Sequence, residues 1–394
     1  MPLIPATPEE LSAILVSASA EQRPITPWGA GQHQHLGMAA HPNSLVVQTT
    51  ALNRILEYAP ADLTVTAEAG ARLADIQAAL QPHGQWLPWN PSGGALATIG
   101  GLLAAGRSGP LRLGYGTPRD WLLGARVALG DGRLIKSGGR VVKNVAGYDS
   151  HKLHLGALGT LGIILAMTFK IAPLPEFDQT VLGVYADVPA ALAAVARLRT
   201  RPLAPISLAI VTGPAVKTFQ ANAVPSDVLL LARFMGIRAA VERHVHVAES
   251  VGAAPIEDGT ECWHGIAEYA TPVAPDDLIL RIGTRPAALA ALIQALQRHE
   301  PNGASALAEP GAGLAYARWP LRNDMNDIAA RLMALRMDLV AYDGYVVVEA
   351  VPPDLHTTLD CWGPAPATIA LMRSLKAQWD PAGILNPGRY VGGI

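Results

Sequence analysis

The sequence predicts an α+β protein of two domains, and three observations lead to this expectation. The chain has 394 residues, which is long for a single hydrophobic core. Its first half is rich in glycine, and Pro173 and Pro175 mark a change of pattern. Beyond these prolines, strands and helices alternate in an order that occurs twice. We therefore expect a glycine-rich domain followed by a duplicated α+β domain.

The first helix is the clearest element of the N-terminal half. Thr7-Pro8-Glu9-Glu10 is a capping box with proline at the first helical position, so we expect a helix that runs to about Ala20. The elements expected after it are strands over 24–27, 44–49 and 63–68, a helix over 73–80, a hairpin-like pair over 124–129 and 133–136, and a strand over 163–171. Gly93 to Gly116 holds eight glycines, a density that predicts a buried glycine-rich loop.

The second half shows two similar successions of elements. The first consists of a strand over 180–185, a helix over 189–199, strands over 206–211 and 228–233, and a helix over 239–252. The second consists of a strand over 278–282, a helix over 287–298, strands over 305–308 and 314–318, a helix over 324–337, and a strand over 345–350. These βαββα-like units indicate a duplicated ferredoxin-like domain. A last helix over 367–379 precedes an apolar, turn-rich tail that we expect to pack back on the protein.

Composition excludes several classes of protein. The formal charge is -2 and the pI is about 6.6, which predicts neither nucleic acid nor an anionic membrane as a partner. Cys262 and Cys361 are too few for a disulfide framework, a cysteine-rich metal site or an iron–sulfur cluster within this chain. Residues 86–106 carry no charge, but their prolines and glycines make a membrane span a poor interpretation. The N-terminus has no signal-peptide pattern, so we expect a cytoplasmic protein.

Three segments could bind a ligand through their backbone. Pro27-Trp28-Gly29-Ala30-Gly31-Gln32 follows a strand, and it is either a phosphate-binding loop or an ordinary tight turn. Residues 92–101, followed by 106–109, are so dense in glycine that the backbone is expected to approach a flat, elongated ligand with a pyrophosphate in its middle. Residues 143–149, leading to 156–163, could present backbone N–H and C=O groups to a planar heterocycle.

Two common nucleotide-binding patterns are missing from the sequence. It contains no G-x-G-x-x-G, the fingerprint of Rossmann dinucleotide-binding folds. It also contains no G-x-x-x-x-G-K-[ST], which argues against a P-loop nucleotide hydrolase. A dinucleotide site built from the glycine-rich loops must therefore use another fold.

Taken together, these segments resemble the FAD domain of the vanillyl-alcohol oxidase, or p-cresol methylhydroxylase (PCMH)-type, superfamily. The resemblance covers residues 5–175 and 380–389, and the order and spacing of four modest motifs make it specific. Within the superfamily the chain resembles the FAD-binding subunits of glycolate oxidases, and the FAD half of D-lactate and D-2-hydroxyglutarate dehydrogenases. It implies a PCMH-type FAD-binding domain over 1–175, an α+β cap or substrate domain over 176–365, and a C-terminal segment over 366–394 that returns to the FAD domain, with FAD extended between the two domains.

The resemblance also implies roles for residues of the first two segments. The residues that match the first loop, whose amides hold the pyrophosphate, are Gly29, Ala30, Gly31 and Gln32. The residues that match the stretch beside the pyrophosphate and the ribityl chain are Ser92, Gly93, Thr98, Gly100 and Gly101.

Further residues match the flavin and adenine ends of the site. Ser108, Gly109 and Gly114 match the part under the flavin. Gly162 and Ile163 match the adenine-side turn, whereas Asn386 matches the tail that returns to the isoalloxazine. Some relatives attach FAD through a histidine at the position of Gln32, so here we expect FAD to be bound non-covalently.

The chain departs from the family in one respect. Related dehydrogenases carry a segment of the type His-Pro-x-Gly-Asp-Gly-Asn-x-His, which supplies metal ligands and a catalytic base, and this sequence has none. His244 and His246 lie on an expected helix, where residues two apart cannot chelate one ion. We expect His151 and His154 to serve local packing. No metal site is therefore expected, and the catalytic residues stay unassigned.

Arginines are the natural partners of a substrate carboxylate. Arg281 and Arg318 each end an expected strand of the second domain, where each could face the flavin or form a surface charge. We do not assign either one to catalysis.

The resemblance implies oxidation of a small 2-hydroxy acid, with hydride transfer from its carbinol carbon to flavin N5, and glycolate to glyoxylate as the closest substrate pair. The missing metal segment favours a chain that works in a complex with a second flavin subunit and an iron–sulfur subunit, passing electrons to a quinone-type acceptor. Such a complex could lie peripherally at the inner membrane through its partners. The alternatives are a stand-alone D-2-hydroxy-acid dehydrogenase, a reductase like the UDP-N-acetylenolpyruvoylglucosamine enzyme, and a scaffold that has lost FAD.

Overall fold

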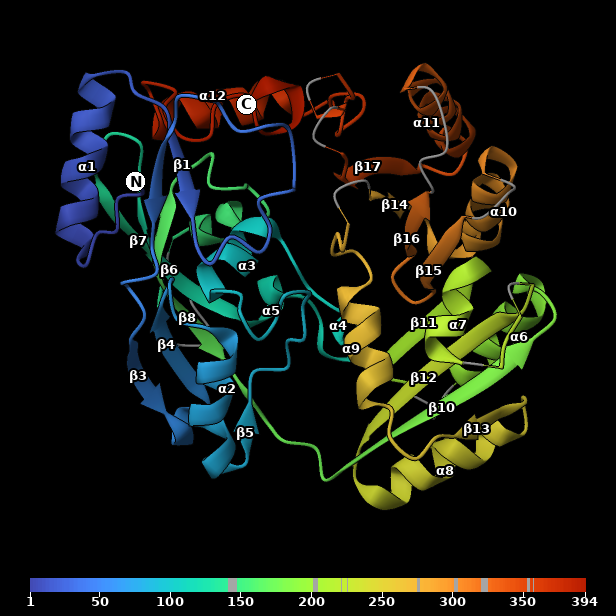
Figure 1. Cartoon of the computed structure of the whole chain (residues 1–394). Coiled ribbons are helices and arrows are strands. Elements are labelled where there is room, and N and C mark those ends of the chain that lie inside the picture. The colour runs from blue at the N-terminus through green and yellow to red at the C-terminus, as the bar shows by residue number, and fades with distance from the viewer. Residues whose placement is uncertain are drawn as a thin grey trace. The chain divides into compact units, whose positions relative to one another are not determined.

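A computed structural model of the chain divides into two compact units (Figure 1). The residues that it describes are 1–140, 147–200, 205–220, 222–224, 226–274, 277–300, 304–319, 325–352, 355–356 and 358–394. The first unit comprises residues 1–108, 117–174 and 364–394. The second unit comprises residues 109–116 and 175–363.

The first unit is built around a five-stranded antiparallel sheet. Its elements are α1 (Pro8–Ala20), β1 (Ile25–Trp28), β2 (Leu45–Gln48), β3 (Ile55–Ala59), β4 (Thr64–Glu68), α2 (Leu73–Leu80), β5 (Gln85–Trp86), α3 (Ile99–Ala105), α5 (Pro118–Trp121), β6 (Leu122–Ala128), β7 (Leu134–Gly138), β8 (Ile163–Lys170), β9 (Ala172–Pro173) and α12 (Ile369–Trp379). The large sheet has the strand order β3-β4-β8-β6-β7, and β1 pairs with β2 in a separate parallel pair.

The N-terminal helix α1 forms as its capping pattern predicts. The Oγ1 atom of Thr7 accepts a hydrogen bond from the backbone N–H of Glu10 at 3.1 Å, and Pro8 opens the helix. Leu11 and Leu15 are fully buried and pack in one core with residues from β1, β2, β8 and the C-terminal tail. Helix α1 is therefore part of the scaffold that positions β1 and the loop after it.

The glycine-dense segment corrects one expectation. We expected buried loop from Gly93 to Gly116, but residues 99–105 form helix α3. The Thr98 side chain caps this helix by accepting from Gly101 N–H at 3.3 Å, and Gly106 ends it with a φ of +66°. Ile99, Leu102 and Leu103 are buried, so tertiary packing outweighs the poor helix propensity of the two glycines.

The second unit is built on an eight-stranded antiparallel sheet. Its helices and strands are α4 (Arg112–Tyr115), β10 (Phe177–Tyr185), α6 (Val188–Leu198), β11 (Ser207–Thr212), α7 (Val216–Phe219), β12 (Val228–Gly236), α8 (Arg238–Glu249), β13 (Ala253–Pro255), α9 (Thr260–Glu268), β14 (Leu278–Gly283), α10 (Leu289–His299), β15 (Ser305–Glu309), β16 (Leu314–Trp319), α11 (Met325–Val340) and β17 (Tyr345–Ala350). The strand order is β13-β10-β12-β11-β15-β16-β14-β17.

This order confirms the predicted duplication. Each half runs βαββαβ along the chain, and each places its first strand between its third and fourth, the arrangement of a ferredoxin-like fold. The halves join where β11 pairs with β15 through residues 210–212 and 306–308. The duplicated pattern in the sequence therefore produces one continuous sheet (Figure 1).

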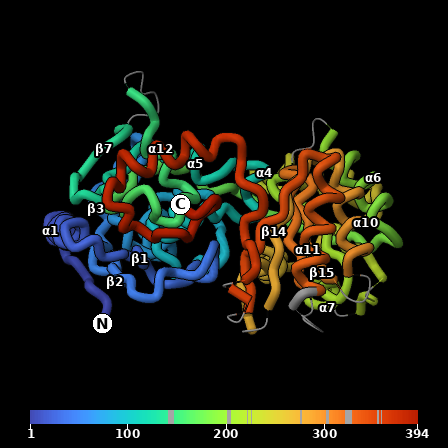
Figure 2. The backbone as a smooth tube through the Cα atoms, turned by 90° about the horizontal axis from the view of Figure 1, so that it is seen from above, coloured from blue at the N-terminus to red at the C-terminus, as the bar shows by residue number. Residues whose placement is uncertain are grey.

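The C-terminal tail returns to the first unit. Ile25 N–H donates to Ile384 C=O at 2.7 Å, and Asn386 N–H donates to Ile25 C=O at 2.8 Å. Ile384 and Leu385 are buried in the same core as α1. Figure 2 shows α12 and the chain's end lying across the elements of this unit. Among the described residues, none of the helices has the length and apolar character to cross a membrane.

Candidate functional site

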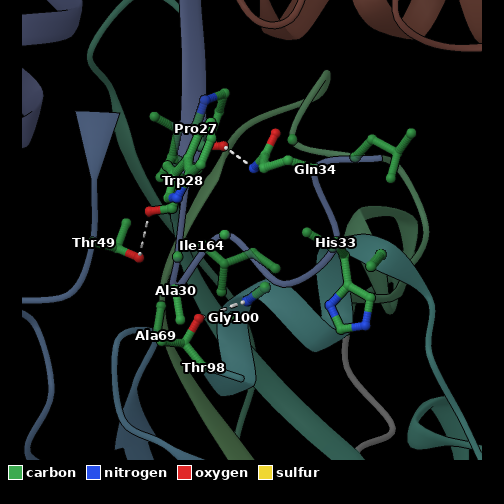
Figure 3. A pocket seen from close by; sticks show the side chains of 18 of the residues that line it. Pro27, Trp28, Ala30, His33, Gln34, Thr49, Ala69, Thr98, Gly100 and Ile164 are labelled. Atoms are coloured by element: carbon green, nitrogen blue, oxygen red, sulfur yellow. Dashed lines mark hydrogen bonds between the residues drawn. The ribbon is translucent and has the colours of Figure 1, made fainter. Parts of the chain in front are cut away.

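An open hollow of about 760 Å³, including the solvent at its mouth, lies within the first unit. Ten of the residues that the family resemblance indicated line it: Gly29, Ala30, Gly31, Gln32, Thr98, Gly100, Gly101, Gly162, Ile163 and Asn386. They come from the loop after β1, the start of α3, the turn before β8 and the C-terminal tail. Figure 3 shows how Ala30, Thr98 and Gly100 gather around this hollow. Segments far apart in sequence thus form one pocket, which we call the loop pocket.

The loop after β1 offers unused backbone donors. The carbonyl of Trp28, at the end of β1, accepts from Thr49 N–H at 2.9 Å, and the carbonyl of Gly31 in the loop accepts from Gln34 N–H at 3.4 Å. The N–H groups of Ala30, Gly31 and Gln32, in contrast, donate to no partner among the described residues. Gly31 has a φ of +82°, a conformation that brings successive amides toward one side and favours glycine. This loop can therefore bind an anion through its backbone.

At the start of α3, in contrast to the first loop, the backbone N–H groups already have partners within the protein. The N–H groups of Ile99 and Gly100 both donate at 2.9 Å to the carbonyls of Ala71 and Ala69. A Cβ on Gly100 would lie 2.6 Å from the Ala69 side chain, and one on Gly29 would lie 2.2 Å from Thr98 Oγ1. Close packing within the protein requires both of these glycines, although the glycine density of residues 92–101 predicts a close approach of the backbone to a ligand.

The tail contributes two buried polar residues to the loop pocket. Asn386 has a φ of +42°, and its Nδ2 donates to Leu158 C=O at 2.6 Å. Its Oδ1 is buried without a hydrogen-bond partner among the described residues. Arg389 donates from Nε to Leu36 C=O at 3.2 Å and from its guanidinium to Gln34 C=O, so it ties the tail to the extension of the first loop. Burial lowers the pKa of Arg389 to about 10, and it stays charged at neutral pH.

The electrostatics of the loop pocket favour an anionic ligand. Among the described residues that line the pocket, Arg389 is a cationic side chain and none is an aspartate or a glutamate. His33, which also lines it, bonds Ser92 Oγ through Nε2 at 3.2 Å. Burial and then the nearby charge of Arg107 lower the pKa of His33 well below its usual value, so this imidazole is neutral at neutral pH. A neutral ring leaves the loop amides and Arg389 as the groups that attract negative charge.

The other five residues on which the resemblance places FAD lie outside the lining of the loop pocket. Ser92 reaches the first loop through His33, and a Cβ on Gly93 would lie 3.2 Å from the Gln32 side chain. Ser108 is buried, with its Oγ unpaired among the described residues. Gly109 and Gly114 belong to the second unit, where Gly114 N–H donates to Ile206 C=O at 3.0 Å. Of the third glycine-rich segment, residues 143–146 fall outside the described part of the chain.

Sequence reasoning passed over several residues that line the loop pocket. The sequence patterns assign no binding role to four lining residues, which are His33, Gln34, His154 and Arg389. His154 belongs to no recognisable motif, and its ring is held by a stacking contact with the distant Trp379. Arg389 directly follows the tail motif, and His33 and Gln34 directly follow the first loop, so adjacency to a motif was the available signal for these three residues.

The two candidate substrate arginines are engaged in ion pairs inside the second unit. Arg281 Nε lies 2.8 Å from Glu349 Oε1, and Arg318 NH1 lies 3.2 Å from Asp277 Oδ2. Arg318 also donates to the carbonyls of Tyr269 and Thr271. Each guanidinium is therefore already neutralised by a carboxylate of its own unit.

A metal centre finds no support in the described residues, which contain no cluster of three histidine, cysteine or acidic side chains able to hold an ion. His246 instead pairs with Glu249 at 3.3 Å on α8. Cys262 and Cys361 are both free thiols, one on α9 and one buried.

Comparison with known families matches the site to flavin enzymes. Residues 2–138 match the FAD binding domain family, and residues 364–390 match the C-terminal domain of FAD linked oxidases. These two ranges contain the first loop, α3 and the tail, which are three of the four segments of the loop pocket.

Individual relatives support the same assignment. The glycolate oxidase subunit GlcE of Escherichia coli is 36% identical over 48% of this chain and 53% of its own length. The glycolate oxidase subunit GlcD of Bacillus subtilis is 33% identical over 54% of this chain and 46% of its own length. An uncharacterized FAD-linked oxidoreductase of Mycobacterium tuberculosis is 27% identical over 98% of this chain and 90% of its own. The chain thus spans about half the length of the two glycolate oxidase subunits that it matches.

A solved structure resembles the whole chain. An alkyldihydroxyacetonephosphate synthase aligns with a TM-score of 0.73 at 17% identity, covering 98% of this chain and 76% of that one. At this identity the likeness concerns the fold alone.

Proposed function

We propose that this chain, which belongs to the PCMH-type FAD-binding superfamily and uses FAD as its cofactor, oxidises a small 2-hydroxy acid, with glycolate as the substrate and glyoxylate as the product. It does so as the FAD-binding subunit of a complex with a second flavin subunit and an iron–sulfur subunit, and the electrons pass to a quinone-type acceptor. When bound, FAD supplies the group that accepts the two electrons of the substrate.

The observation that carries the proposal is the loop pocket. Three successive N–H groups, from Ala30 to Gln32, have no described partner within the protein and suit a pyrophosphate. Asn386 Oδ1 is a buried acceptor that a ligand donor would satisfy. The pocket residues thus fit FAD: the first loop would hold its phosphates, and Gly162, Ile163 and Asn386 would hold its ring systems.

Two observations favour a complex. The chain resembles subunits of glycolate oxidase, GlcE and GlcD, over about half of its length. It also lacks the histidine-rich segment that supplies a base and metal ligands in stand-alone dehydrogenases of this superfamily. A partner flavin subunit would supply that chemistry.

A second candidate function is that of a stand-alone D-2-hydroxy-acid dehydrogenase. The D-lactate dehydrogenase of Archaeoglobus fulgidus is 33% identical over 46% of this chain, which is comparable to the glycolate oxidase matches. In this case the catalytic base would be a residue of this chain and not of a partner subunit.

Anaerobic spectroscopy separates the two functions. The chain is purified alone and, separately, coexpressed with the second flavin subunit and the iron–sulfur subunit of its own organism, and each sample receives glycolate or D-lactate. We expect a flavin spectrum in both samples and bleaching by glycolate only in the complex. Bleaching of the lone chain by D-lactate would favour the second candidate, and a complex that neither acid reduces would contradict both.

A further inference from the structure

His154 is a buried polar side chain to which the proposed function assigns no role. It ends the short 3-10 helix Ser150–His154, its surface is 3% exposed, and it lines the loop pocket. Its ring stacks on Trp379 of α12 with 5.0 Å between the ring centroids and 16° between the ring planes. This stacking involves the ring faces and leaves both nitrogens at its edge.

Both ring nitrogens of His154 lack a hydrogen-bond partner among the described residues. Burial, and then the neighbouring His151, lower the pKa of His154 to about 4, so the ring is neutral at physiological pH. A neutral imidazole presents one N–H donor and one acceptor. Packing against Trp379 needs neither group, because a phenylalanine would stack equally well.

The surroundings of His154 indicate the ligand. Gly162, which the family resemblance places at the adenine side, lies so close that a Cβ there would be 3.1 Å from His154 Cε1. Asn386 Oδ1 is a third buried polar atom of the same pocket without a partner among the described residues. Buried polar atoms without a hydrogen-bond partner are rare inside proteins, and three of them on two side chains of one pocket indicate a ligand that carries its own donors and acceptors.

We propose that His154 is a cofactor-binding residue whose imidazole hydrogen-bonds the adenine half of FAD. Adenine carries ring nitrogens that accept and an amine that donates, which match the two groups of a neutral imidazole. The inference rests on FAD as the cofactor, and it is independent of which 2-hydroxy acid is oxidised.

The test measures ligand affinity on the flavin-free full chain. Binding of FAD, FMN and ADP is measured by calorimetry for the wild type, His154→Phe, His154→Gln and the control His246→Phe, whose histidine is exposed on α8 of the second unit. Phenylalanine retains the stacking on Trp379 but removes both nitrogens, whereas glutamine retains a donor and an acceptor. Melting temperatures of the apoproteins check folding, and His154→Met is a second apolar variant with the same expectation.

We expect His154→Phe to weaken FAD and ADP binding about tenfold, which corresponds to about 1.4 kcal/mol, with FMN binding unchanged. His154→Gln should retain most of the affinity, and His246→Phe all of it. Wild-type affinity for FAD in His154→Phe would overturn this inference alone, as would an equal loss for FMN and FAD. A wild-type chain that bound no FAD would overturn the cofactor assignment as well.

Discussion

Lys376 and Asp380 hold the C-terminal tail in place through individual contacts. Lys376 Nζ lies 2.6 Å from Asp380 Oδ2 and also donates to the carbonyls of Thr160 and Leu385. Asp380 accepts from the N–H groups of Ile384 and Leu385 at 3.1 and 2.8 Å. Burial lowers the pKa of Lys376, and the charge of Asp380 opposes this shift. The pair fixes the turn that brings Asn386 and Arg389 to the loop pocket.

Breaking this pair should destabilise the first unit. Lys376→Met leaves the buried carboxylate of Asp380 without its cation, so we expect the free energy of unfolding to fall by about 3 kcal/mol. The measurement is urea unfolding followed by tryptophan fluorescence. The control is Lys152→Met, which removes the solvent-exposed pair with Asp149 and should change stability by less than about 1 kcal/mol. Equal effects of the two variants would contradict the role given to Lys376.

His154 should make the stability of the apoprotein depend on pH. Its folded pKa of about 4 lies below the value of about 6.5 in an unfolded chain. Above pH 6.5 both states are neutral; as the pH falls toward 4, the unfolded state takes up the proton first and stability declines, by about 3 kcal/mol in total. His154→Phe should show a shallower decline when unfolding is measured between pH 7 and 4.5, and an unchanged slope would argue against a buried, neutral His154.

Helix α3 shows how packing and ligand binding use different glycines. Gly100 lies against Ala69, where a Cβ would be 2.6 Å from the Ala69 side chain and 2.9 Å from its carbonyl oxygen. A Cβ on Gly101 would meet only Thr98 Oγ1, at 3.1 Å. Both glycines line the loop pocket, but only the first one determines how closely α3 approaches the loop after β4.

These two glycines should respond differently to alanine. Gly100→Ala forces the helix away from Ala69, so we expect a loss of about 1–3 kcal/mol in the stability of the apoprotein. Gly101→Ala raises helix propensity by up to about 1 kcal/mol, but the new Cβ makes one tight contact with Thr98. Because these two effects oppose each other, we expect only a small net change in stability. Thermal unfolding of the flavin-free variants provides the comparison, and a larger loss for Gly101→Ala would contradict the packing account.

At the level of the whole chain, the first unit is completed by its own C-terminus. Residues 364–394 belong to it, although the 189 residues from 175 to 363 separate them in sequence from the rest of the unit. Leu385 is fully buried, next to Ile25 in the core. Folding of the first unit therefore requires the last residues of the chain.

A single tail residue should report on this dependence. Leu385→Ala leaves a cavity between the tail and β1, so we expect a loss of about 2–5 kcal/mol in unfolding free energy together with weaker FAD binding. Leu371→Ala, in the same C-terminal segment but 71% exposed, is the matched control and should change stability by less than about 0.5 kcal/mol. Both variants are compared by urea unfolding and by flavin content after purification, and an undiminished flavin content in Leu385→Ala would separate the tail from the cofactor site.

Local sequence was enough to predict the elements whose signals are local. The capping box at Thr7 starts α1, the hairpin-like pair over 124–129 and 133–136 becomes β6 and β7, and the repeated strand–helix order becomes the duplicated sheet. In these segments the local sequence pattern favours the same helix, strand or turn that the fold requires, so local preference and tertiary structure agree. Residue patterns alone could not decide whether residues 27–32 form a phosphate-binding loop or a simple turn. The family resemblance supplied FAD as the ligand.

Only the tertiary structure decided which residues share a pocket. Helix α3 forms because Ile99 and Leu103 are buried, and no local signal outweighs its glycines. His154 reaches the loop pocket because Trp379, 225 positions later in the chain, supports its ring, and Arg389 reaches it through carbonyls more than 350 residues earlier. Such contacts depend on packing between segments that are distant in the chain. Local patterns in a single sequence do not show which of these segments come into contact.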